Sequence, residues 1–169
     1  MRIALLHNGS AGGRHAHELA DALREAGHDP HVLSARPAGP AEALLRRRGF
    51  AGSLTPVPSG VVALLRGGFD VAHAFSTADA LTALTWRRLG GGPAVFTCTE
   101  ALRRDRLADR RLSLWLLQRA VQDTDALVAA TEESREALAR WLALDAPVIE
   151  SHDAAGYERL YRELLIRRT

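Results

Sequence analysis

The sequence contains no lysine, so its 22 basic residues are all arginines, and the 20 acidic residues leave a net charge of only +2. This small excess gives no argument for nucleic-acid binding. The single cysteine, Cys98, excludes an internal disulfide bond and favours a reducing, cytoplasmic setting. No apolar run approaches the roughly 18 residues of a membrane-spanning helix, and the apolar start at 1–6 is too short for the core of a signal peptide. We therefore expect a cytoplasmic protein.

The 169 residues suit one domain, and a composition of 47% hydrophobic and 25% charged residues is that of a globular protein. Short apolar segments alternate with longer segments of helical periodicity. Most of the short segments are apolar on both faces, as in Ile3–Leu6, which is typical of a parallel sheet covered on both sides. We predict a single α/β domain of the Rossmann-like, doubly wound type, with a mostly parallel sheet of about seven strands and helices on both faces.

The predicted strands are Arg2–Leu6, His31–Ser34, Leu54–Val57, Asp70–Phe75, Ala94–Cys98, Ala126–Ala129 and Val148–Glu150. The predicted helices are Gly13–Ala26, Thr77–Leu89, Leu102–Val121, Thr131–Leu142 and Ala154–Ile166. The segment Arg36–Pro58 is rich in glycine, proline and alanine, and we predict loops around one short helix there. No linker divides the chain.

The first strand leads into a glycine-rich turn that opens the first helix, which is where doubly wound sheets bind ligands. The residues predicted to hold an anion are Gly9, Ser10, Gly12, Gly13 and Arg14. Glycines let backbone N–H groups approach a phosphate, and a helix N-terminus adds about half a positive charge. The alternative is that the glycines only permit a tight turn. The spacing differs from the G-x-G-x-x-G of dinucleotide enzymes, although Arg36 after the second strand leaves NADP as a weaker alternative.

Four segments of the sequence follow one another in an order that is characteristic of one protein family. They are Glu18–Leu33 after the Gly12-Gly13 turn, Phe69–Ala74, Pro93–Thr97 and Asp125–Thr131. Together they resemble glycosyltransferase family 4, and the likeness extends to about Glu150. The resemblance implies a GT-B enzyme of two Rossmann-like domains, in which the N-terminal domain binds the acceptor and the C-terminal domain binds a nucleotide sugar.

The resemblance also implies that the donor-binding domain is missing. After Glu150 the family continues into that domain, whereas this chain continues with Ser151 and a last helix that resembles the family's closing helix. We expect the acceptor-side half of a nucleotide-sugar-dependent system, not competent alone, with the nucleotide sugar as donor substrate and no cofactor. A homodimer or a separate donor-domain subunit would then be the partner. The alternative is a non-catalytic binding or assembly module.

In the family that the sequence resembles, a histidine close to the reaction centre occupies the position that is Thr99 in this chain. Glu100 follows Thr99. Thr99 cannot act as a base near neutral pH, but Glu100 could if its pKa were raised. The candidate catalytic residues are therefore His73 and Glu100, and Thr99 and Thr131 join the candidate ligand-binding set. His73 has an alternative interpretation as a hydrogen-bonded histidine of the core.

Two further patterns have structural interpretations. His15 and His17 are two positions apart on a helix, so they lie on different faces and we expect no shared metal.

The arginine-rich stretch 102–119, with Trp115, could contact anionic lipid as a peripheral helix at the inner face of the membrane. We favour the alternative of an amphipathic helix packed on the sheet, with solvated arginines that pair with Asp105 and Asp109.

Overall fold

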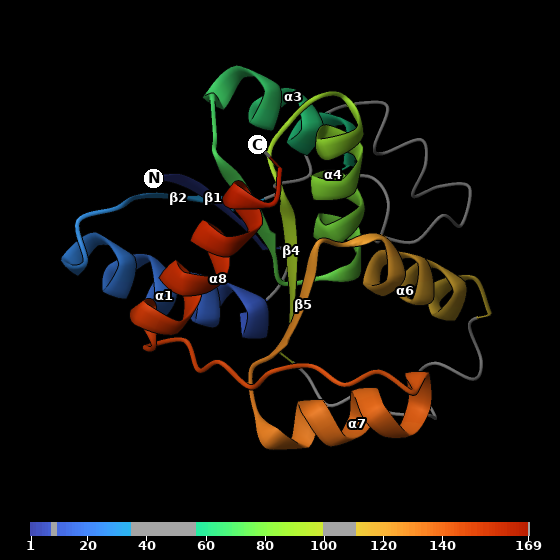
Figure 1. Cartoon of the computed structure of the whole chain (residues 1–169). Coiled ribbons are helices and arrows are strands. Elements are labelled where there is room, and N and C mark those ends of the chain that lie inside the picture. Colours follow the sequence, from blue (N-terminus) through green and yellow to red (C-terminus); the bar gives the residue numbers. More distant parts are fainter. Residues whose placement is uncertain (8–9, 35–56, 100–110, 169) are drawn as a thin grey trace.

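The computed structural model describes residues 1–7, 10–34, 57–99 and 111–168 (Figure 1). Within this part of the chain, five parallel strands form one sheet in the order β2-β1-β3-β4-β5. The strands are β1 (Arg2–His7), β2 (Asp29–Ser34), β3 (Val71–Ala74), β4 (Ala94–Cys98) and β5 (Ala126–Ala129). The helices are α1 (Ser10–Glu25), α3 (Val57–Gly67), α4 (Thr77–Arg88), α6 (Arg111–Asp123), α7 (Glu132–Leu142) and α8 (Ala154–Ile166). The predicted α/β class with a doubly wound parallel sheet is confirmed. The sheet has five strands in the described residues, fewer than the predicted number of about seven.

Two predicted strands account for the difference. Val57 begins α3 rather than ending a strand, and the remainder of that segment lies outside the described residues. Val61 and Leu64 of α3 are buried while Val62 and Leu65 are exposed, so the apolar residues follow a helical stripe rather than strand alternation. Val148 forms only an isolated bridge to Ala129.

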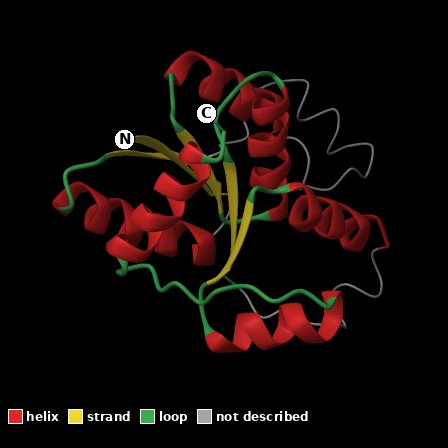
Figure 2. Cartoon of the chain, in the orientation of Figure 1, coloured by secondary structure: helices red, strands yellow, loops and turns green. Residues whose placement is uncertain are grey.

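Helices cover the sheet in two layers (Figure 2). Successive side chains of a strand point to opposite faces of the sheet and therefore into different layers. Ile3 and Leu5 of β1 pack in one core cluster with residues of α1 and α8. Ala4 and Leu6 pack on the opposite face with residues of α3 and α4. The prediction of helices on both faces is therefore confirmed, and every residue of β3 and β4 is buried, as expected for strands covered on both sides.

The strand order reverses next to β1, which has β2 on one side and β3 on the other. In such sheets the crevice outside the carboxyl ends of the strands, at the point of reversal, is the usual ligand site. The N-terminus of α1 lies at this end of the sheet because α1 follows β1 directly. After α7 the chain runs back past the end of β5 to α8, which packs beside α1 (Figure 1).

Candidate functional site

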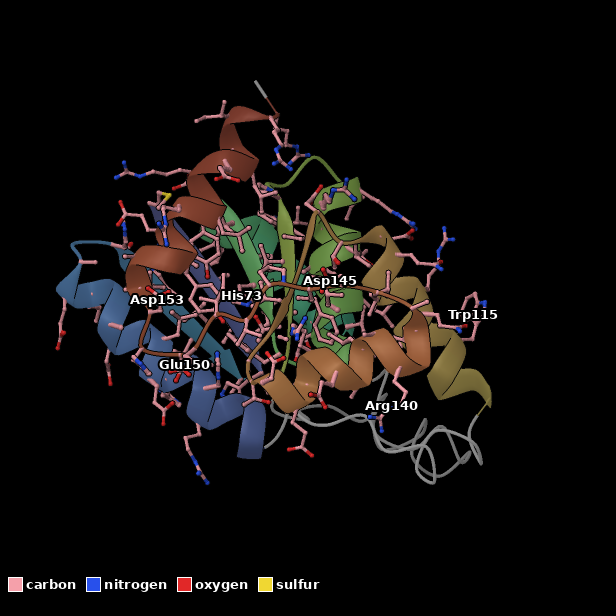
Figure 3. All side chains as sticks on the ribbon, turned by 60° about the horizontal axis from the view of Figure 1, so that its bottom comes forward. His73, Trp115, Arg140, Asp145, Glu150 and Asp153 are labelled. Carbon is pink, nitrogen blue, oxygen red and sulfur yellow. The ribbon has the colours of Figure 1, made fainter. Side chains whose placement is uncertain are left out.

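A pocket of about 360 Å³ lies at the carboxyl end of the sheet. Its walls come from the N-terminal half of α1, the ends of β4 and β5, and the segment that connects α7 to α8. The lining residues are Arg14, His15, Glu18, Thr99, Ala130, Thr131, Glu150, Ser151 and His152. Glu150 lies on the connecting segment, beside α1, in Figure 3. Residues from distant parts of the sequence thus meet at the edge where the fold places ligands.

The structure brings three of the predicted ligand-binding residues together in this pocket: Arg14, Thr99 and Thr131. Arg14 is exposed on α1, and Thr99 directly follows β4. Thr131 is the N-cap of α7, and its hydroxyl oxygen accepts a hydrogen bond from the backbone N–H of Ser134 at 3.1 Å. One of its lone pairs is therefore committed to the helix cap.

The structure places five other predicted residues outside the pocket lining or does not describe them. Ser10 is the first residue of α1, and Gly9 and Glu100 lie outside the described residues. Gly12 and Gly13 lie inside the first turns of α1, because the helix begins at Ser10 and not at Gly13 as predicted.

The two glycines allow α1 to approach the sheet closely. A Cβ atom at Gly12 would lie 3.0 Å from the Cβ atom of Phe75, which follows β3, and 3.1 Å from its carbonyl oxygen. A Cβ atom at Gly13 would lie 2.9 Å from Nδ1 of His7. Helix packing therefore explains both glycines without a ligand, and anion binding at this turn stays a prediction.

His73 lies in the interior of the domain rather than in the pocket (Figure 3). Its side chain is 0% exposed, with Nδ1 2.6 Å from the Tyr161 hydroxyl and Nε2 2.6 Å from Oγ1 of Thr97. Burial lowers the pKa of His73 well below its ordinary value, and nearby His15 lowers it further. A neutral imidazole with both nitrogens engaged has no contact with an incoming substrate. This geometry favours the core interpretation of His73 over the catalytic one.

A hydrogen-bonded network connects this buried histidine with the pocket. The Tyr157 hydroxyl lies 3.4 Å from Oγ1 of Thr97 and donates to the backbone carbonyl of Ile149 at 3.1 Å. The same hydroxyl lies 3.3 Å from Nε2 of His15, which lines the pocket. Sequence reasoning missed the network. The available signal was that the chain has only two tyrosines, Tyr157 and Tyr161, four residues apart and therefore on one face of the last helix.

The charges of the pocket are mixed. Glu18 accepts a hydrogen bond from the Ser151 hydroxyl at 2.6 Å, and Glu150 lies 3.1 Å from Nε2 of His152. Burial lowers the pKa of His15, although neighbouring Glu18 acts in the opposite direction. Besides two histidines, the described lining carries one guanidinium and two carboxylates. Such a lining offers hydroxyl groups many acceptors and one strong donor.

The other sequence predictions concern regions away from the pocket. Cys98 is buried, as predicted for a small apolar residue. The first half of the arginine-rich stretch 102–119 lies outside the described residues, which resume at Arg111, and Trp115 of α6 is 58% exposed. Among the described helices, none has the length and apolar character needed to cross a membrane.

Comparisons with known proteins address the fold and the family of the chain. A search of curated proteins gives no significant match. The chain is similar in structure to a sucrose-phosphate synthase from Thermosynechococcus elongatus, with a TM-score of 0.66 and 16% sequence identity over 97% of this chain and 99% of that one. At that identity the likeness supports the fold alone. The model of the family Glycosyltransferase Family 4 matches residues 12–150, which is most of the sequence. The chain therefore belongs to glycosyltransferase family 4.

Proposed function

We propose that this chain is the acceptor-side half of a nucleotide-sugar-dependent glycosyl transfer system and that it does not transfer sugar alone. The observation that carries the proposal is the mixed-charge pocket at the carboxyl ends of β4 and β5, next to the start of α1. In a member of this family, that edge of the sheet is where an acceptor would approach the donor.

The electrostatics of the pocket support the acceptor side over the donor side. A nucleotide sugar brings a diphosphate, which would meet the carboxylates of Glu18 and Glu150, and among the described lining residues only Arg14 carries a guanidinium to neutralise it. Like charges at short range are unfavourable, whereas carboxylates accept hydrogen bonds from neutral hydroxyl groups. The pocket therefore suits the hydroxyl groups of an acceptor. The groups that neutralise a diphosphate would come from elsewhere.

The path of the chain supports the same assignment. Val148 bridges to Ala129, and α8 begins at Ala154, so only a short segment connects the sheet to the closing helix. In the family resemblance described above, the donor domain occupies this interval. A separate donor-domain subunit, or a second copy of this chain, would then face the pocket across Glu150.

The proposal is tested by adding a neutral glycoside, methyl glucoside, and a nucleotide sugar, UDP-glucose, to the isolated chain. We expect the glycoside to shift the NMR signals of pocket residues and UDP-glucose to remain intact. Arg14→Gln should weaken glycoside binding about three- to tenfold, the effect of losing one hydrogen bond worth about 0.7–1.4 kcal/mol. Arg24→Gln is the matched control, because Arg24 lies on the same helix and pairs with Asp21.

Each result has a distinct meaning. Release of UDP by the isolated chain would refute the claim that it is not competent alone. Absence of glycoside binding, combined with stable capture of a partner protein, would instead support the alternative of a non-catalytic assembly module. Equal effects of the two arginine variants would show that the pocket is not the binding site.

A further inference from the structure

The buried network fixes the direction of its own hydrogen bonds. Burial raises the pKa values of Tyr157 and Tyr161, so both phenols keep their protons. Among the described residues, the only hydrogen-bond partner of the Tyr161 hydroxyl is Nδ1 of His73. Because a buried donor without an acceptor is costly, Tyr161 must donate to Nδ1. The His73 proton is then on Nε2 and is donated to Thr97.

The same reasoning applies to the outer end of the network. A phenol has one proton, and that of Tyr157 goes to the carbonyl of Ile149, which can only accept. The Tyr157 oxygen is left to accept, so in the 3.3 Å contact the proton belongs to Nε2 of His15. Nδ1 of His15 then carries a lone pair. Nδ1 has no hydrogen-bond partner among the described residues, and His15 lines the pocket.

We infer that His15 is a specificity-determining residue of the pocket, where Nδ1 accepts a hydrogen bond from a hydroxyl group of the bound acceptor. Tyr157 is its positioning residue, since it selects the tautomer that presents a lone pair. The inference rests on the proposed function and deepens it, because it selects a neutral hydroxyl donor over an anion. An imidazole lone pair repels a fully ionised phosphate oxygen, which has no proton to donate.

The surroundings of His15 keep the imidazole neutral near neutral pH. Glu18 on the same helix, and Glu150 and His152 across the pocket, face it together with Arg14. Tyr157 of α8 contacts it from the interior, where His73 also lies. Desolvation outweighs Glu18, and the pKa of His15 falls below its ordinary value. Acidification below the ordinary histidine value of 6.5 would eventually protonate Nδ1 and remove the acceptor, so glycoside affinity should fall as the pH is lowered.

The tautomer is measured without any ligand from side-chain ¹H–¹⁵N correlations of histidine, with the His15 signals assigned by their loss in His15→Gln. We expect wild-type His15 to be the Nε2–H tautomer. Tyr157→Phe should convert it to a mixture of tautomers, because the acceptor that selects Nε2–H is gone. Tyr161→Phe is the matched control: it removes the same hydroxyl from the same helix and should change His73 while leaving His15 unchanged.

Methyl glucoside and sulfate, a fully ionised oxyanion, are then added separately. We expect the glycoside to shift Nδ1 of His15 and sulfate to leave it unchanged, and His15→Phe to weaken glycoside binding about five- to tenfold. An Nδ1–H tautomer of His15 in the wild-type protein would overturn the inference, and this measurement does not depend on any variant being folded. So would glycoside binding that leaves His15 unperturbed. Failure of the glycoside to bind at all would refute the proposed function instead, and the ligand-free tautomer distinguishes the two failures.

Discussion

Asp79 provides a test of the electrostatics of the core, because it is a carboxyl group almost removed from water. It lies in the first turn of α4 and is 3% exposed, and it accepts a hydrogen bond from the hydroxyl of Ser76, the N-cap of that helix. Burial raises the pKa of Asp79 to about 6, although the hydrogen bond from Ser76 acts in the opposite direction. Desolvation therefore outweighs the favourable position at a helix N-terminus.

The raised pKa has a defined effect on stability. The folded state holds the proton of Asp79 up to a pH of about 6, whereas the unfolded chain releases it near the ordinary value of 3.8. The contribution of this group is therefore fully present below pH 3.8 and is lost as the pH rises through 6. One pKa unit corresponds to about 1.4 kcal/mol, so the loss amounts to about 3 kcal/mol. Asp79→Asn removes the titration and keeps a polar group of similar size.

We expect the free energy of unfolding of Asp79→Asn to rise by about 3 kcal/mol relative to that of the wild type as the pH increases from 4 to 7. The measurement is urea unfolding at intervals of one pH unit. Glu133→Gln is the control, because it removes an exposed carboxylate from the first turn of α7. A stability difference between Asp79→Asn and the wild type that stays constant with pH would refute the reasoning. It would show that the folded protein does not hold the proton of Asp79.

Three further predictions concern the core. His73→Leu should lower the free energy of unfolding by about 2–4 kcal/mol, because it leaves the buried Tyr161 hydroxyl without an acceptor; a loss below 0.5 kcal/mol, roughly the experimental error, would contradict the network. Gly12→Ala should cost about 1–3 kcal/mol, since the new methyl group meets Phe75, and an unchanged urea midpoint would show that α1 can shift away. The thiol of Cys98 should react with a thiol reagent only on unfolding, and rapid modification of the native protein would contradict its burial.

Much of the fold could be predicted from the sequence because the local patterns agree with the tertiary structure. The doubly apolar segment Ile3–Leu6 forms β1, covered on both faces, and Ala154–Ile166 forms α8 with the predicted bounds. The segment that begins at Val57 was wrongly predicted as the end of a strand. Pro58 near the start of α3 obscured the helix, although proline is tolerated in the first turn.

The candidate site was less predictable, since it depends on contacts between residues far apart in the sequence. Position after a strand predicted Thr99 as a site residue and position in the first turn predicted Arg14, and both residues line the pocket. The same reasoning suggested His73 as a catalytic residue, but the structure encloses its side chain in the core. Proximity to the end of a strand does not reveal whether a side chain faces solvent or a covering helix. Tyr161, 88 residues further along, determines that His73 is enclosed.

The closing helix connects the stability of the core with the chemistry of the pocket. Tyr157 is 0% exposed and stacks on Tyr161, so α8 forms part of the core, yet its hydroxyl contacts His15 at the pocket. A polar network in the interior stabilises a fold only when every member has a partner. Occupancy of the pocket at His15 and docking of α8 must therefore influence each other, because binding to one conformation stabilises that conformation. In this chain the last helix, through Tyr157, determines which nitrogen of His15 carries a proton and which presents a lone pair to a ligand.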